Sequence, residues 1–478
     1  METCPTTRRG LRMPAWVTSL SYLFLLFWAA GAQADEDSFL DDLQERTFDW
    51  FWEFSPPPHG LTLDRAPHEG GFCSVAALGF ALTAYPVGVE RGWVTRDEGI
   101  ERTLNTLRFL MEAPQHDGAH ATTGYRGFFY HFIDPDTGWR FRQVELSTID
   151  TALLMAGVLF CREYYQREHP KEVEIRDLAD RLYRRVDWAW MQQPDHLIGH
   201  GWKPETGSLQ HAYKGYNEAM LLYLLALGSP THPIRQEGWH AFEASCVYDA
   251  FESFEFIQFT PLFGHQYSHV WVDFKGIQDV LMQTYAMDWF ENSRRATLSQ
   301  RAYAIRNPMG WEGYGPNIWG LTACDGPVNG EWVIKGNKRR LWTYAARGAS
   351  SIRTRDDGTI APTAAGGSLP FAPTEVMAAL QAMQDEYGAD IYTRYGYVDA
   401  FNPSLKEAPK PLQHGHIVPD KGWFDDEHLG IDQGPILLMA ENHRTGLIWR
   451  FMRRSPYLRR GLERAGFKGG WLSEAQQQ

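Results

Sequence analysis

Residues 211–228 read HAYKGYNEAMLLYLLALG, a polar segment that turns into an almost unbroken apolar run. Glu218 stands at the turning point, directly before Ala219. An ionised carboxylate is costly in an apolar surrounding unless it is paired. Because a helix that is apolar on every side belongs to the interior of a fold, the stretch predicts an interior helix with a carboxyl group at its start.

Four further stretches have the same design: a polar or glycine-rich segment is followed by a predicted helix that is apolar on nearly every side. Helices of a second kind keep one polar face, as in VTRDEGIERTLNTLRFLMEA, where Thr95 and Glu98 form a capping box. EVEIRDLADRLYRRVDWAW repeats this design, with Val173 and Ile175 on its apolar face. The further interior helices are expected in GGFCSVAALGFALTAY from Gly70, STIDTALLMAGVLFCREYY from Ser147, TEVMAALQAM from Thr374 and GIDQGPILLMAENH from Gly430.

The two kinds of helix interleave along the chain, as an inner ring packed within an outer ring requires. We therefore predict an all-α fold, an (α/α)6 toroid, as a single domain over residues 35–478. The alternative is an ordinary multi-helix domain without a closed ring. A few short β-hairpins are expected in loops at one mouth of the ring, from GYRGFFYHFI, GWRFRQVEL, FEFIQFTPLF and GTIAPTAAGG.

The first residues have the order of a secretory signal. Arg8, Arg9 and Arg12 precede the apolar stretch PAWVTSLSYLFLLFWAAG, which ends in Ala32-Gln33-Ala34. We expect residues 1–34 to be removed, leaving a periplasmic or secreted protein; the alternative is a single membrane anchor. No second segment is long and apolar enough to span a bilayer, so no stable membrane insertion is expected after signal removal.

Composition narrows the choice of partners. The chain has 478 residues and a formal net charge of −13, which argues against nucleic acid as the main partner. The sequence shows no metal-binding or cofactor-binding pattern, so neither is expected, and a monomer is favoured. The four cysteines beyond the signal form no C-x-x-C pair and are expected to be buried free thiols rather than a disulfide framework: Cys73, Cys161, Cys246 and Cys324.

Carboxylates recur at the predicted starts of the interior helices. Asp150, Glu218 and Asp432 all occupy such positions, and the helix starts of an inner ring gather at one face. Any one of them could simply cap its helix or interact favourably with the helix dipole. Together they provide the two carboxylates that glycoside hydrolysis needs, one kept protonated by an apolar setting and one that activates water. Glu218 has the apolar neighbours that raise a carboxyl pKa.

Other residues near these positions complete the predicted site. His131 could orient substrate hydroxyl groups, although a structural histidine is equally consistent with the sequence. Arg353, Arg355, Asp356 and Asp357 are interpreted as a solvated loop. The remaining substrate-binding candidates are Glu145, Asp325 and Gln433, with Tyr216, Trp271, Trp311, Tyr314 and Trp319 as stacking surfaces for sugar rings.

Six blocks of sequence together resemble a known family. They are FFYHFIDPDTGWR, VELSTIDTALLMAG, YNEAM, YGPNIWGLTACDGP, YGYVDAFNP and WFDDEHLGIDQGPILLMAENHRTG. In this order they resemble the glucoamylase-like family, which includes the bacterial endo-β-1,2-glucanases of glycoside hydrolase family 144. The resemblance implies an (α/α)6 toroid, export, and inverting hydrolysis of β-linked glucans without a metal. On this resemblance Glu218 looks like the general acid and a late aspartate, Asp399 or Asp432, like the base. Its position at the start of another interior helix makes Asp432 the preferred one.

Three functions remain open at this point. The first is an exported glycoside hydrolase acting on a neutral β-glucan, most consistent with β-1,2-glucan. A polysaccharide lyase is the second, but a lyase needs cations to neutralise a uronate, and these motifs are acidic. The third is a non-catalytic periplasmic glycan-binding protein, which would not need several buried acids.

Overall fold

The computed structural model describes residues 1, 36–67, 71–407 and 411–474. The chain divides into two compact units, Met1–Leu43 and Gln44–Gln478. The expected signal, residues 1–34, lies outside the described residues apart from Met1. Within the described ranges, the structure contains no helix with the length and apolar character needed to cross a membrane.

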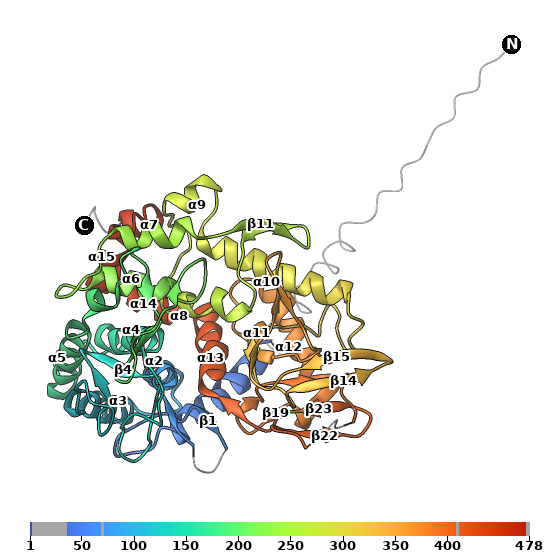
Figure 1. Cartoon of the computed structure of the whole chain (residues 1–478), viewed down its shortest axis with the longest axis horizontal. Coiled ribbons are helices and arrows are strands. Elements are labelled where there is room, and N and C mark those ends of the chain that lie inside the picture. The colour runs from blue at the N-terminus through green and yellow to red at the C-terminus, as the bar shows by residue number, and fades with distance from the viewer. Residues whose placement is uncertain (2–35, 68–70, 408–410, 475–478) are drawn as a thin grey trace. The chain divides into compact units, whose positions relative to one another are not determined.

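Four helices of the second unit are buried nearly all round, as the sequence predicts (Figure 1). They are α2 (Val75–Arg91), α4 (Thr148–Tyr164), α6 (Met220–Gly228) and α13 (Gly430–Arg444). The interior position predicted for TEVMAALQAM is wrong. That stretch lies in α12 (Pro373–Tyr387), whose buried residues are interspersed with half-exposed and exposed ones, so the helix has a polar face.

The helices with a polar face also match the sequence at their starts. α3 (Arg96–Glu112) begins after Thr95 with the expected capping box, and α5 (Pro170–Arg184) buries Ile175. Val173 is exposed, because it lies on the polar side of α5. The remaining helices are α7 (Glu237–Ala244), α8 (Tyr267–Trp271), α9 (Val280–Thr284), α10 (Trp289–Arg306), α11 (Pro362–Gly366), α14 (Leu447–Met452), α15 (Pro456–Arg464) and α16 (Gly470–Glu474), with 3-10 turns η1 (Trp188–Met191), η2 (Leu262–His265) and η3 (Gly388–Asp390).

The buried helices contact one another in a circuit. α2 packs against α4, α4 against α6, α6 against α8, α8 against α13, and α13 against α2 and α11. Figure 1 shows α13 between α2 on one side and α11 on the other. Glycines allow the closest of these approaches: a Cβ at Gly79 of α2 would lie 2.3 Å from the carbonyl oxygen of Leu153 in α4.

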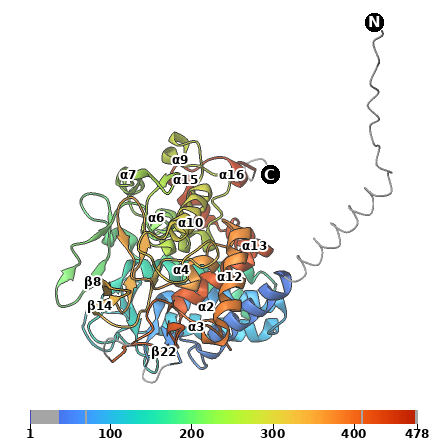
Figure 2. The same cartoon turned by 90° about the vertical axis from the view of Figure 1, so that its right-hand side faces the viewer.

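The strands are more numerous than the few hairpins expected, although each has only two to five residues. Figure 2 shows β8 and β14 on one side of the second unit and α12 and α13 on the other. In the described chain the largest sheet has the order β3-β4-β6-β8-β9. The strand expected in GTIAPTAAGG is wrong, because Pro362 at a first helical position starts α11 there.

The strands have the following bounds in chain order. The first half of the chain contains β1 (Arg65–Ala66), β2 (Cys73–Ser74), β3 (Gly124–Tyr125), β4 (Phe128–Tyr130), β5 (Phe132–Ile133), β6 (Leu146–Ser147), β7 (Ile198–Gly199), β8 (Gly201–Lys203), β9 (Gly207–Ser208) and β10 (Ala212–Tyr213). The rest are β11 (Tyr248–Phe251), β12 (Phe254–Ile257), β13 (Ala323–Cys324), β14 (Gly330–Ile334), β15 (Asn337–Leu341), β16 (Ala345–Ala346), β17 (Gly348–Ala349), β18 (Thr354–Arg355), β19 (Tyr392–Thr393), β20 (Gly396–Tyr397), β21 (Phe401–Asn402), β22 (His416–Val418), β23 (Gly422–Phe424) and β24 (His428–Leu429).

Two short pairings place the loops that carry charged residues. β1 pairs antiparallel with β24, so that Arg65 lies opposite Leu429 at the start of α13. β13 pairs antiparallel with β16, with Cys324 opposite Ala345. The prediction of free thiols is confirmed: the four cysteines after the signal are unpaired, and all but the half-buried Cys246 are buried.

Candidate active site

Glu218 lies in the turn immediately before α6, not inside the helix. The turn is held by Ser268, whose hydroxyl donates to the Glu218 carbonyl oxygen at 3.0 Å, and by Asn217, whose side-chain oxygen accepts from the Ala219 N–H at 2.9 Å. The Glu218 residue is half-buried. Burial, with a smaller contribution from the charge of Asp150, raises the pKa of its carboxyl group to about 7. Near neutral pH this side chain is therefore able to hold a proton and release it.

His131 joins two of the predicted carboxylates, Glu145 and Asp150. Its Nδ1 lies 2.8 Å from Glu145 Oε1, and its Nε2 lies 3.7 Å from Asp150 Oδ1. Burial alone would lower the pKa of His131, but the carboxylates of Asp150 and Glu145 raise it to about 9. The hydrogen bond from His131 in turn lowers the pKa of Glu145 to about 2. Asp150 lies in the first turn of α4, where Ser147 caps the helix, so this ion group is fixed to a helix start.

Three predicted aspartates form a second group. The backbone N–H of Asp325 donates to Asp399 Oδ2 at 2.6 Å, and the buried carboxyl groups of Asp399 and Asp432 act directly on each other. Burial, and then the mutual repulsion of the carboxylates, raises the pKa of Asp399 and that of Asp432. Two adjacent buried carboxylates resist carrying two charges, so we expect the pair to hold one proton near neutral pH.

Arg65 provides the cation of this group, and the sequence interpretation did not include it. Its Nη1 donates to Asp325 Oδ2 at 2.6 Å and to Glu427 Oε2 at 3.0 Å, and its Nε lies 3.3 Å from Asp64 Oδ2. His414 Nδ1 lies 3.3 Å from Glu427 Oε2. Arg65 follows no recognisable motif. Glu427, by contrast, stands in the quoted WFDDEHLGID block, which was the one available signal for it.

The two groups of carboxylates border the same site. Tyr267 of α8 is buried, and its hydroxyl donates to the carbonyl oxygen of Ile431 at 3.0 Å. Burial and then the nearby charges of Asp432 and Glu218 hold the pKa of Tyr267 well above its usual range. Tyr267 therefore lies within electrostatic reach of both groups. The aspartates are buried, whereas Glu218 and His131 contact solvent, so the second group forms the deeper part of the site.

Most of the aromatic residues expected to stack on sugar rings lie in the core instead. Tyr216 stacks on Trp289, with ring centroids 4.8 Å apart, and Trp271 donates from Nε1 to the Thr83 hydroxyl at 3.0 Å. Their faces are covered by protein, which corrects the sequence interpretation. The same holds for Trp311 and Trp319, which are also buried.

Two other substrate-binding candidates are engaged within the protein. The Tyr314 hydroxyl donates to Asp356 Oδ1 at 2.8 Å, and Gln433 Nε2 donates to the carbonyl oxygen of Tyr397 at 2.8 Å. The interpretation of residues 353–357 as a solvated loop is wrong for its acidic part. Asp356 and Asp357 are buried, because Asp356 also accepts from Tyr303 and Asp357 pairs with Arg347.

Among the described residues, two sets of side chains offer metal-ligand atoms within 4.8 Å of one another: Asp325, His414 and Glu427, and Asp325, Asp399 and Asp425. In the first set, the Arg65 guanidinium already neutralises Asp325 and Glu427. In the second set, Asp399 accepts from the backbone N–H of Asp325 and lies against Asp432. A cation would have to displace these partners.

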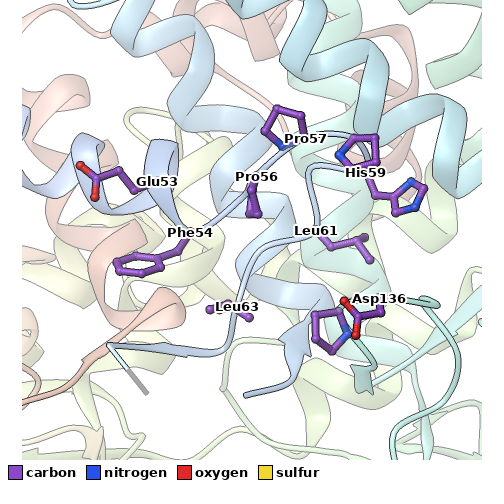
Figure 3. A pocket seen from close by; sticks show the side chains of 10 residues that line it. Glu53, Phe54, Pro56, Pro57, His59, Leu61, Leu63 and Asp136 are labelled. Carbon is purple, nitrogen blue, oxygen red and sulfur yellow. The ribbon is translucent and has the colours of Figure 1, made fainter. Parts of the chain in front are cut away.

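A separate pocket of about 310 Å³ lies at the loop of residues 54–63 (Figure 3). Prolines and apolar side chains such as Phe54, Leu61 and Leu63 line much of it, with Glu53, His59 and Asp136 at its edges. None of the carboxylates of the two groups lines this pocket. The pocket is therefore distinct from the candidate active site.

Comparison with known proteins gives the family. The family model described as "Glycoamylase: Putative glucoamylase" matches residues 210–456. An exo β-1,2-glucooligosaccharide sophorohydrolase (non-reducing end) from Parabacteroides distasonis is 29% identical over 461 residues, which cover 90% of this chain. The chain spans 58% of the length of that relative.

Solved structures agree with this match. A protein from Bacteroides uniformis ATCC 8492 described as a putative glucoamylase has a TM-score of 0.78 and 30% identity, covering 91% of this chain and 98% of its own. The endo-β-1,2-glucanase from Chitinophaga pinensis, solved with sophorotriose and glucose, has a TM-score of 0.76 and 26% identity, covering 91% of this chain and 99% of its own. The resemblance noted from the sequence blocks is confirmed, and the chain belongs to the glucoamylase-like family.

Proposed function

We propose that the protein is a glycoside hydrolase that cleaves β-1,2-glucan. The observation that carries the proposal is Glu218, a half-buried carboxyl group with a pKa of about 7 at a site bordered by a proton-sharing aspartate pair. This is the acid-and-base arrangement that glycoside hydrolysis requires. The names of the Parabacteroides and Chitinophaga relatives support β-1,2-glucan as the substrate class.

The proposed architecture is the (α/α)6 toroid. The closed circuit of contacts through α2, α4, α6, α8 and α13, with α11 packed against α13, supports an inner ring of helices. Asp150, Glu218 and Asp432 then occupy the starts of three of these helices, which explains why residues distant in sequence share one site.

In the proposed reaction, protonated Glu218 donates its proton to the glycosidic oxygen as the bond from that oxygen to the anomeric carbon breaks. A water molecule attacks the anomeric carbon from the opposite face, and its proton passes to the pair formed by Asp399 and Asp432. The anomeric configuration inverts, because one displacement occurs.

The experiment that tests the function is incubation of the purified protein with β-1,2-, β-1,3-, β-1,4- and β-1,6-glucans. Cleavage of the β-1,2-glucan, with release of a product in the α configuration seen by proton NMR, supports the proposal. A product that absorbs in the ultraviolet would indicate a lyase instead. Binding of a glucan without cleavage would indicate a glycan-binding protein.

The pH dependence of kcat/KM is expected to be bell-shaped near neutrality. Glu218 is active when protonated, so the rate should fall as the pH rises through about 7. The aspartate pair must carry a charge to accept a proton, and its raised pKa values make the rate fall again on the acid side. In the Glu218→Gln variant, the pH profile of the residual kcat/KM should no longer fall on the alkaline side. An unchanged alkaline limb in that variant would assign the titration to another group.

Export is proposed as well, from the charged and apolar start of the chain and its Ala32-Gln33-Ala34 ending. N-terminal sequencing of the protein from its native location tests it. A chain that begins at Asp35 supports cleavage, and one that begins at Met1 indicates an anchor.

A further inference from the structure

Tyr344 is an exposed aromatic residue beside the aspartate group. It lies between β15 and β16 and is 47% exposed. In the antiparallel pairing of β13 with β16, Ala345 lies opposite Cys324. The next residues outward are Tyr344 on one strand and Asp325 on the other, and side chains of directly opposite residues lie on the same face of an antiparallel pair. The pairing therefore brings residues 344 and 325 close together, and the charges that act on Tyr344 include those of Asp432, Asp399 and Asp325.

The guanidinium of Arg347 holds this turn in place. It donates from Nη2 to the carbonyl oxygens of Trp342 at 3.0 Å and Thr343 at 3.2 Å, and from Nη1 to that of Cys324 at 2.7 Å. Two bonds of 2.8 and 2.9 Å to Asp357 hold the guanidinium itself. Because one buried side chain fixes both the turn and the residue before Asp325, the ring is positioned before any ligand arrives.

The Tyr344 hydroxyl has no hydrogen-bond partner within the described ranges of the chain. Burial on its inner side, and then the charges of Asp432 and Asp399, hold the pKa of Tyr344 well above its usual range. The hydroxyl is therefore a hydrogen-bond donor at neutral pH. Tyr267 differs, because it is buried and already donates to the carbonyl oxygen of Ile431.

A sugar unit offers an apolar face of C–H groups and an edge of hydroxyl oxygens. Sites for such molecules combine aromatic surface with a few placed polar groups. Tyr216 and Trp271 cannot provide this surface, because they lie in the core. Tyr344 provides both an open ring face and a free donor.

We propose that Tyr344 contacts the substrate, packing its ring against a sugar unit of the glucan and donating a hydrogen bond from its hydroxyl, beside the aspartate group. The proposal rests on the proposed function, since it names a substrate contact of the same site. It concerns binding and positioning of the glucan, and it assigns no proton transfer to Tyr344.

The test is the kinetics of Tyr344→Ala and Tyr344→Phe on the glucan that the wild-type protein cleaves. For Tyr344→Ala we expect KM to rise about tenfold or more, equivalent to about 1.4 kcal/mol, with a much smaller change in kcat. Tyr344→Phe keeps the ring and removes the donor, so its KM should rise about two- to tenfold. The melting temperature should be unchanged in both variants, because nearly half of the side chain is in solvent.

Tyr248 provides a matched control. It lies on β11, and the groups that shift its pKa, Glu255 first among the charges, do not include the aspartates of the site. Tyr248→Ala and Tyr248→Phe should leave KM at the wild-type value. Calorimetric titration of a β-1,2-glucooligosaccharide into Glu218→Gln, with and without Tyr344→Ala, measures binding without turnover and should show the same loss of affinity.

The outcomes separate the two proposals. If the wild-type protein cleaves the glucan and Tyr344→Ala has wild-type KM and affinity, the contact is overturned and the function stands. A loss of kcat at constant KM would also overturn the contact as stated. If no glucan is cleaved or bound by the wild-type protein, both proposals fail.

Discussion

Replacing Glu218 with glutamine is expected to lower turnover on β-1,2-glucan by about 10²–10⁴-fold, with KM changed little. Glutamine keeps the size of the side chain and its hydrogen-bonding capacity, but it has no transferable proton. The structure favours this role because the carboxyl group keeps its proton up to a pH of about 7. Initial rates of reducing-end release from the purified variant provide the measurement.

The leaving group provides a sharper form of the same test. A general acid matters less when the departing oxygen is already a weak base, so an activated aryl glycoside should be cleaved by Glu218→Gln with a much smaller loss than the glucan. Loss of a base would affect both substrates equally. Glu255→Gln on β12 serves as the control for removal of an exposed carboxylate. Near wild-type turnover of the glucan by Glu218→Gln would return this residue to a structural role.

Replacing Arg347 with methionine is expected to destabilise the protein by about 3–5 kcal/mol, because it leaves a buried charge without its partner. The side chains of Arg347 and Asp357 are both 0% exposed, and Arg347 also donates to several backbone carbonyl groups. Urea unfolding followed by tryptophan fluorescence measures the loss. Arg347→Lys keeps the charge but not the planar guanidinium group. The stability of this variant should therefore lie between that of the wild type and that of Arg347→Met.

An ion pair at the surface provides the comparison for this effect. Arg108 and Glu174 form a pair with side chains 44% and 38% exposed. Removing it with Arg108→Met should cost about 0–1 kcal/mol. Combining Arg347→Met with Asp357→Asn should recover part of the loss, because the unpaired charge is then gone. A loss in Arg347→Met no larger than that in Arg108→Met would contradict the importance of the buried pair.

The interior helices could be predicted from sequence because their apolar runs have a single physical explanation. The run after Glu218 is apolar on every side, and a helix with such a surface is stable only when other helices cover it. The carboxylates at the helix starts were identifiable for the same reason, since a charge beside an apolar run needs a special setting. Glu218 and Asp150 illustrate this, because the structure finds both near one another at helix starts.

The aromatic residues and Arg65 show where a single sequence is insufficient. A tryptophan such as Trp271 looks the same in a sequence whether its ring faces a sugar or the core. Only the packing around the ring decides between the two, and here it buries Trp271. Arg65 has its role through ion pairs with Asp325 and Glu427, which lie hundreds of positions later in the chain. No local pattern encodes such a contact. Asp357 was misplaced because its partner Arg347, ten residues earlier, lies between β16 and β17, and no sequence pattern joins the two.

The antiparallel pairing of β1 with β24 has a consequence for biosynthesis. It joins Arg65 to Leu429 and thereby links segments made near the beginning and near the end of translation. During synthesis, Arg65 leaves the ribosome long before Glu427 and α13 exist, so its counter-charges are incomplete until nearly the whole chain has emerged. Contacts of such long sequence separation form slowly. A newly made chain therefore passes through a stage in which helices already synthesised can pack while the group of carboxylates around Arg65 is still unassembled.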